Sequence, residues 1–116
     1  MTGEKELTIK ATEKDIESYF VRKVRQAGGR AYKFGQNGLP DRICVFPGGL
    51  VYFVELKRPG ERPRPLQYNR QKELTALGAS VVPYIDTKTG VDTFVDSVLK
   101  GRMRSYMERY RDCSKG

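Results

Sequence analysis

The chain of 116 residues contains no histidine. That absence excludes histidine-ligated metal sites, Ser-His and Cys-His nucleophilic catalysis, and hydrolysis of RNA by a pair of histidines. Any catalytic metal must therefore be held by oxygen atoms, which favours Mg²⁺ or Mn²⁺ over zinc. A glycine-rich phosphate-binding motif is also absent, so the sequence does not predict the use of ATP.

The chain has only two cysteines and no evident long apolar run. The two cysteines, Cys44 and Cys113, fall in an expected strand and in the C-terminal segment. They indicate neither a disulfide framework nor a zinc site, and a reducing cytoplasm fits them best. No signal peptide and no long apolar run is evident, so we expect a soluble protein.

Basic residues outnumber acidic ones, with 22 Lys and Arg against 14 Asp and Glu, giving a net charge of +8. This excess favours a polyanionic partner, and nucleic acid fits better than a membrane because no amphipathic membrane-binding helix stands out. The length and the 38% hydrophobic content predict one small domain. We divide the chain into a loose lead (1–11), a folded domain (12–100) and a basic amphipathic C-terminal segment (101–116).

The pattern of apolar residues, caps and turn residues predicts an α/β fold of order α-β-β-β-α-β-α. A mixed central sheet with helices on its faces is expected. Helices are predicted after Thr12, from Pro65 to Leu77 and over 91–100, with a further helical segment over 101–112. The strands are predicted at 30–34, 41–46, 50–57 and 79–85.

A β-hairpin contains the most informative pattern in the chain. Asp41 begins one expected strand, and Glu55 and Lys57 lie near the end of the next. If the hairpin mirrors about Gly48, Asp41 falls opposite Glu55, and Lys57 points to the same face as Glu55. Two carboxylates and an amine on one face indicate a divalent-metal site suited to phosphodiester hydrolysis.

An ion-pair network would also satisfy these three charged side chains. Against that alternative, Val51 to Leu56 is apolar on both faces, which is typical of a central strand. A carboxylate in such a strand is costly unless it holds a proton, a partner or a metal. The strand also leads into a basic segment, residues 58–64, which we call the arginine loop.

Other polar residues are candidates for the same site. Glu13 lies on the apolar stripe of the first helix, where it also complements the helix dipole. Glu17 lies at the rim of that stripe and either pairs with a lysine or projects towards the sheet. We favour Glu17 as a third acid. Gln67, at the start of the second helix, is either a solvated glutamine or a hydrogen-bond partner of a metal-bound water or a phosphate.

Two surfaces are candidates for larger partners. Arginine grips phosphate with a planar fork, so three arginines of the arginine loop are expected to contact DNA. These are Arg58, Arg62 and Arg64. An apolar stripe at helical spacing near the C-terminus either covers the domain's own core or binds a second copy of the chain. Its members are Met103, Tyr106, Met107 and Tyr110.

With these residues in view, the chain resembles the PD-(D/E)xK nuclease superfamily and, more narrowly, the virus-type replication-repair nuclease (VRR-NUC) domain. The resemblance covers roughly residues 12 to 86. Its motifs are Glu13-Lys14-Asp15-Ile16-Glu17, Gly28-Gly29, Gly38-Leu39-Pro40-Asp41-Arg42, Phe53-Val54-Glu55-Leu56-Lys57-Arg58-Pro59, Gln67 and Gly78.

The resemblance implies a restriction-endonuclease-like core with the active site on the hairpin. It implies that Asp41, Glu55 and Leu56 bind Mg²⁺ or Mn²⁺ and that Lys57 orients or helps to deprotonate the attacking water. Glu17 would complete the acidic cluster, although Glu13 fits the family pattern as well. Gln67 would fill the family's glutamine position, and Arg42 joins the arginines expected to contact DNA.

Stand-alone bacterial and phage members of this family are similar to Holliday-junction resolvases. We therefore expect a homodimeric, structure-selective DNA endonuclease in a bacterial or phage-infected cell. Two alternatives are a non-catalytic basic DNA-binding module and a sequence-specific endonuclease of restriction type. The second needs base-reading elements for which so short a chain leaves little room.

Overall fold

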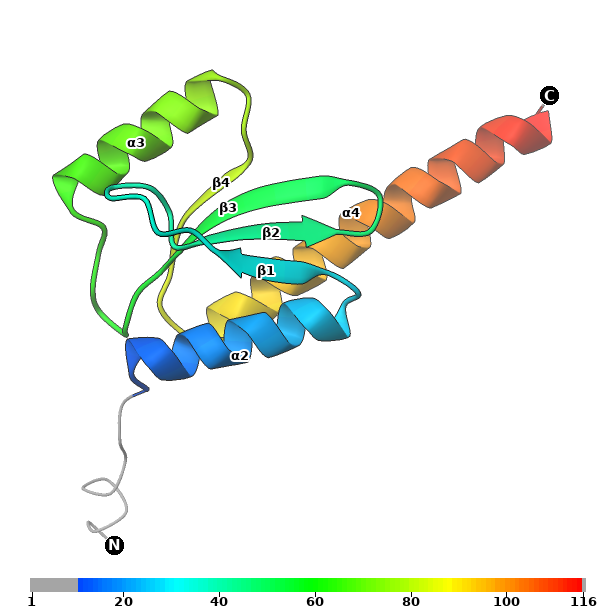
Figure 1. Ribbon diagram of the computed structural model, residues 1–116. Coiled ribbons are helices and arrows are strands. Elements are labelled where there is room, and N and C mark those ends of the chain that lie inside the picture. The colour runs from blue at the N-terminus through cyan, green and yellow to red at the C-terminus, as the bar shows by residue number, and fades with distance from the viewer. Residues whose placement is uncertain (1–10, 116) are drawn as a thin grey trace, which may run out of the picture.

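The computed structural model describes the backbone of residues 11–115 and the side chains of residues 11–101. The elements follow the predicted order, and the α/β prediction is confirmed (Figure 1). They are α2 (Glu13–Gln26), β1 (Arg30–Lys33), β2 (Arg42–Phe46), β3 (Leu50–Leu56), α3 (Pro65–Ala76), β4 (Val81–Ile85) and α4 (Lys88–Lys115). The predicted lead lies outside the described residues except for Ala11.

Helix α4 differs from the prediction because the two expected C-terminal helical segments are one continuous helix. It begins earlier than predicted, since Thr87 caps it by accepting the Gly90 N–H at 2.9 Å. The expected boundary between residues 100 and 101 falls inside this helix, whose C-terminal half extends beyond the sheet (Figure 1). The side chains of the predicted apolar stripe (103–110) lie outside those described. Within the described residues, no helix is both long and apolar enough to cross a membrane.

The sheet is mixed, with strand order β1-β2-β3-β4. Strand β2 pairs antiparallel with both β1 and β3, whereas β3 and β4 are parallel. Arg42 lies opposite Val54, and Phe46 lies opposite Leu50, so the hairpin does mirror about Gly48. Gly48 has a φ of +92°, a conformation that favours glycine and allows the short turn. The predicted register of the hairpin is therefore confirmed.

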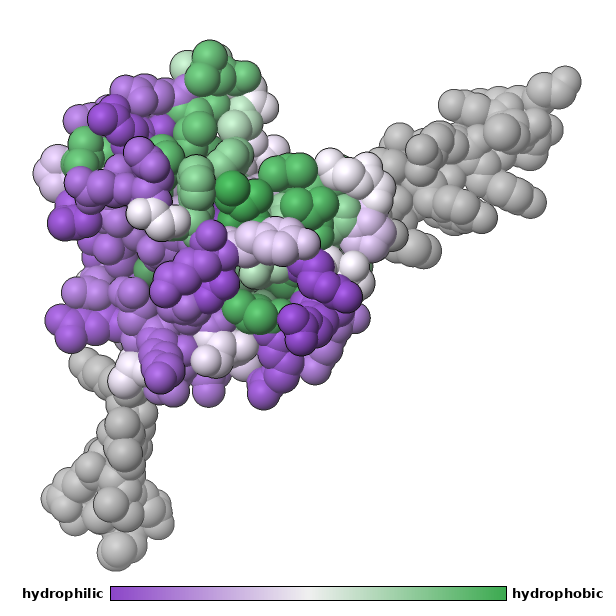
Figure 2. Space-filling model, viewed as in Figure 1, coloured by the Kyte–Doolittle hydropathy of each residue, from purple (hydrophilic) through white to green (hydrophobic). Residues whose placement is uncertain are grey.

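Helices α2 and α4 lie side by side against one face of the sheet and enclose the core between them (Figure 1). This core consists of Ile16, Phe20, Val24, Cys44, Phe46, Val54, Leu56, Ile85, Val91, Val95 and Val98. Helix α3 contacts the other face at β4. Beyond α3 that face is partly open, and its exposed apolar side chains include Val45 and Val51. Figure 2 shows an apolar surface over the centre of this face.

Strand β4 forms one edge of the sheet and contains Pro83. Proline has no backbone N–H to offer a neighbouring strand. The carbonyl oxygen of Pro83 accepts a hydrogen bond of 2.8 Å from the Gln71 side-chain amide. Gln71 thus joins α3 to this edge.

Candidate active site

The hairpin brings Asp41 next to the end of β3. Asp41 immediately precedes β2, and the register of the two strands places it opposite Glu55 on the same face. The Asp41 carboxylate is fixed there, because its Oδ2 accepts the backbone N–H of Leu56 at 3.0 Å. The start of α2 and the arginine loop lie at the same end of the sheet (Figure 1).

Glu55 is buried, with 1% of its surface exposed. Its Oε2 accepts a hydrogen bond of 2.7 Å from the Gln67 amide and lies 3.4 Å from the Lys57 ammonium nitrogen. Its Oε1 is buried and has no hydrogen-bond partner within the described part of the chain. Burial, followed by repulsion from the Asp41 carboxylate, raises the pKa of Glu55 to about 7, while Lys57 opposes the rise.

Gln67 connects this carboxylate to the beginning of α3. Its Oε1 accepts the backbone N–H of Arg64 at 2.8 Å, and its amide group donates to Glu55. Only 6% of Gln67 is exposed, so it is not the solvated residue of the alternative interpretation. With Oε2 of Glu55 engaged by Gln67 and Lys57, Oε1 is the oxygen left for a further ligand.

Glu17 and Arg42 form an ion pair with each other. Alternate side chains of a strand point to opposite faces, so Arg42 points towards α2 and α4 while Asp41 points to the other face. Only 13% of the Arg42 side chain is exposed, and its Nε is buried without a partner among the described residues. The structure therefore places Arg42, expected to contact DNA, in a partly buried ion pair and ties Glu17 to it.

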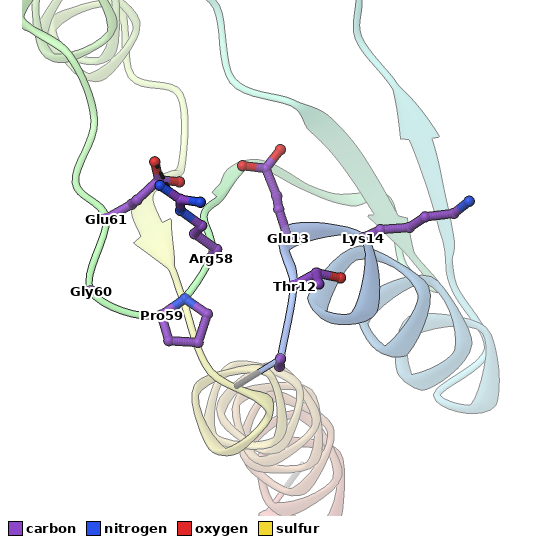
Figure 3. A pocket seen from close by; sticks show the side chains of 8 residues that line it. Thr12, Glu13, Lys14, Arg58, Pro59, Gly60 and Glu61 are labelled. Atoms are coloured by element: carbon purple, nitrogen blue, oxygen red, sulfur yellow. Dashed lines mark ion pairs between the residues drawn. The ribbon is translucent and has the colours of Figure 1, made fainter. Parts of the chain in front are cut away.

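Glu13 is the acid of α2 that faces the hairpin carboxylates. Partial burial raises the pKa of Glu13, as does repulsion from Asp41, while Lys57 lowers it. Figure 3 shows its side chain between α2 and the part of the arginine loop that carries Arg58 and Glu61. Sequence reasoning favours Glu17, because it lies one turn deeper in the helix, whereas the helix dipole accounts for Glu13. The ion pair of Glu17 with Arg42 on β2 is the contact that the sequence does not reveal.

The three arginines of the arginine loop differ in their surroundings. Arg58 is exposed and lies 3.2 Å from the Glu61 carboxylate, and Arg64 is also exposed. Arg62 instead pairs with Asp86 at 3.2 Å. A cleft of about 980 Å³ separates the loop from the start of α2 (Figure 3). Its lining is Ala11, Thr12, Glu13, Lys14, Arg58, Pro59, Gly60 and Glu61.

The donor atoms at the hairpin fit a hard divalent cation. The buried, unpartnered Oε1 of Glu55 and the nearby Asp41 carboxylate are the oxygen ligands that Mg²⁺ and Mn²⁺ prefer. Leu56 has a buried apolar side chain, so only its backbone carbonyl could join them. Across the described residues, no group of three or more His, Cys, Asp or Glu side chains is placed to hold a metal. A set of three acids is thus not assembled around either Glu17 or Glu13 in the described part of the chain.

Of three comparisons with known proteins, a search of protein-family models finds no match. The other two find similar proteins. Over 73 residues the chain is 47% identical to "Putative nuclease p44" of Acyrthosiphon pisum secondary endosymbiont phage 1. The matched region covers 60% of this chain and 78% of that protein. A solved structure described as a VRR_NUC domain matches with a TM-score of 0.67 and 26% sequence identity, covering 74% of this chain and 97% of that one.

The mixed four-stranded sheet, with its carboxylates at the end of a hairpin, defines a small α/β domain of nuclease type. The chain belongs to the VRR-NUC family.

Proposed function

We propose that this protein is a metal-dependent, structure-selective DNA endonuclease, and that it resolves Holliday junctions as a homodimer. The observation that carries the proposal is the state of Glu55. A carboxylate with 1% exposure, one unpartnered buried oxygen and a lysine 3.4 Å from the other oxygen is costly to maintain for stability alone. It suits a site that binds a cation and hydrolyses a phosphodiester.

The metal would be held by Glu55 Oε1, Asp41 and the Leu56 carbonyl. A divalent cation there would stabilise negative charge on the scissile phosphate and acidify the attacking water. The Lys57 ammonium, held beside Glu55, would orient that water or stabilise charge on the phosphate. Water adds across the P–O bond, leaving a phosphate on one strand end and a hydroxyl on the other.

The surrounding charge supports DNA as the substrate. The net charge of +8 and the exposed Arg58 and Arg64 favour contact with phosphates, which carry no sequence information by themselves. Selection by DNA shape follows more naturally from such contacts than selection by sequence. The named nuclease activity of the phage protein, and a site of action in a bacterial or phage-infected cell, fit this proposal.

A homodimer would present two such sites related by a two-fold axis, matching the two strands cut in a four-way junction. We propose the C-terminal segment of α4 as its contact, because this helix extends past the sheet and its sequence contains the Met/Tyr stripe. Size-exclusion chromatography with light scattering at micromolar concentration tests the dimer. A monomer mass would rule out the paired-site mechanism.

Cleavage of a labelled four-way junction, beside a linear duplex of the same sequence, tests the activity. We expect paired cuts in the junction with Mg²⁺ or Mn²⁺ and none in EDTA. Asp41→Asn should lower the rate at least 100-fold. Cleavage of both substrates would retain the nuclease but not its selectivity for junctions.

The Glu55–Lys57 ion pair also fits a non-catalytic DNA-binding module. That alternative predicts DNA binding that is indifferent to Mg²⁺ and no cleavage under any condition. Asp96→Asn, an exposed acid on α4, is a suitable control for the loss of one negative charge. Equal activity losses for Asp96→Asn and Asp41→Asn would contradict a specific role for Asp41.

A further inference from the structure

Both ends of the arginine loop are joined to the candidate active site. The residue before the loop, Lys57, pairs with Glu55 through its side chain and continues the β3–β4 ladder by donating its backbone N–H to Ile85 at 2.9 Å. The last residue of the loop, Arg64, donates its backbone N–H to Gln67, which in turn holds Glu55. The path of the loop is therefore coupled to the position of the Glu55 carboxylate.

A single carboxylate fixes the middle of the loop. Asp86 directly follows β4, one residue beyond the last ladder contact. Its Oδ2 accepts the backbone N–H of Gly60 at 3.0 Å and a hydrogen bond of 3.2 Å from Arg62 Nη1. The Arg62 guanidinium also lies over the Tyr84 ring, 4.5 Å from its centroid. Asp86 and Tyr84 together hold Arg62 against the end of β4.

The loop sequence restricts the remaining freedom of the backbone. Arg58, Arg62 and Arg64 each precede a proline, and a residue before proline is confined to extended conformations. Pro63 is buried while its two arginine neighbours are exposed. A stiff loop held at its middle presents its exposed arginines in a fixed direction.

We propose that Asp86 is a positioning residue that fixes the arginine loop beside the active site. In this assignment Arg62 holds the loop, and Arg58 and Arg64 contact phosphate. The statement about phosphate depends on the proposed function, whereas the statement about the loop does not. Because the loop is ordered before DNA arrives, its ordering entropy is not lost during binding.

Limited proteolysis tests the loop without using DNA. Staphylococcal V8 protease cuts after glutamate, and Glu61 lies at the middle of the loop. We expect Asp86→Ala to accelerate the cut after Glu61 at least fivefold, measured by mass spectrometry of the resulting fragments. Asp86→Asn should give an intermediate rate, because its amide oxygen can still accept the Gly60 N–H. Asp96→Ala, which removes an exposed acid from α4, should match the wild type.

Salt-dependent DNA binding, measured by fluorescence anisotropy in EDTA, tests the assignment of the arginines. Arg58→Leu removes a phosphate contact, so the slope of log K against log salt should become shallower by about 1. Arg62→Leu should weaken binding about fivefold with the slope unchanged. In the Asp86→Ala background it should weaken binding less than twofold, because the contact that it removes is already lost.

The outcomes of these two experiments distinguish the positioning role of Asp86 from the assignment of the arginines to phosphate. An unchanged V8 rate in Asp86→Ala overturns the positioning role whatever the DNA results show. A slope change of about 1 for Arg62→Leu overturns its assignment, because Arg62 would then contact phosphate itself. If the wild-type protein cuts no DNA but the loop and the salt slopes behave as expected, the nuclease proposal fails and the positioning role stands. A merely destabilised Asp86→Ala protein would be cut faster at many sites instead of selectively after Glu61, which also overturns the proposal.

Discussion

Gln67 donates a hydrogen bond of 2.7 Å from its side-chain amide to Glu55, and that contact orients the buried carboxylate. The other end of the same amide accepts the Arg64 N–H, so Gln67 has one permitted orientation. A residue expected to contact water or phosphate thus acts on the carboxylate itself. It leaves Glu55 Oε1 as the unpartnered oxygen.

Replacing Gln67 with methionine should therefore weaken metal binding. We expect Mn²⁺ affinity, measured by calorimetry, to fall about 10-fold or more, as is typical when a partner that orients a metal ligand is lost. The free energy of unfolding should also fall by about 1–3 kcal/mol, because buried polar groups lose their partners. Gln71→Met is the matched control, since Gln71 is equally buried in α3 but bonds to Pro83. It should destabilise the fold and leave Mn²⁺ affinity unchanged, so equal affinity losses would contradict the role of Gln67.

Replacing each of the two acids of α2 with glutamine should have different effects on stability and on cleavage. Glu17→Gln breaks the ion pair with the partly buried Arg42 and should lower the free energy of unfolding by about 1–3 kcal/mol. Glu13→Gln should leave unfolding within about 0.5 kcal/mol, as is usual for exposed positions, but reduce metal-dependent cleavage at least 10-fold. Chemical denaturation and junction cleavage measure the two effects. The reverse pattern would return the role of third acid to Glu17.

Stability without metal should fall as the pH rises through the range set by Glu55. Burial and Asp41 raise the pKa of this carboxyl from 4.5 to about 7. Between these values the folded protein retains a proton that the unfolded chain has released, so raising the pH favours unfolding. In EDTA, the melting temperature of the wild type should fall from pH 5 to pH 8 by about 10 °C or more beyond that of Glu55→Gln, as for about 2–3 kcal/mol. Parallel curves for the two proteins would show that Glu55 titrates normally.

Cys44 should resist thiol reagents until the protein unfolds. The residue is fully buried between β2 and the helices, and burial raises the pKa of its thiol to about 12. The thiolate is the reactive form, so little of it exists at neutral pH. In a Cys113→Ser background, labelling by DTNB should follow the unfolding curve in urea. Rapid labelling under native conditions would contradict the packing of this core.

Much of the fold follows from local signals in the sequence. The two glycines after Pro47 predict a short turn, and the positions of the charged residues about Gly48 predict the register that the strands adopt. The apolar character of β3 on both faces predicts its central place in the sheet. The extent of α4 was harder to predict, because Gly90 and Gly101 look like helix ends. Burial of Val91 against the core and the Thr87 cap place the start of the helix before Gly90, and the helix continues through Gly101.

The candidate site was predictable only where strand pairing determines it. Asp41, Glu55 and Lys57 meet because a hairpin register brings them together. The choice between Glu13 and Glu17 depends on Arg42, a partner 25 residues from Glu17, which helical spacing does not reveal. The ion pair that engages Arg62 with Asp86, in place of the expected contact with DNA, likewise joins segments distant in sequence.

Pro83 has a consequence for how two copies of this chain can meet. At that position the β4 edge offers no amide proton, and its carbonyl oxygen is already bonded to Gln71. An incoming strand would find both hydrogen-bonding groups missing there, so this border of the sheet is closed to strand addition. The opposite border, β1, is lined by Arg30 and Lys33, and strands of two copies paired there would bring like charges together. Both borders of the sheet thus disfavour edge-to-edge pairing of strands from two copies, so a dimer built through helices would leave the sheet unextended.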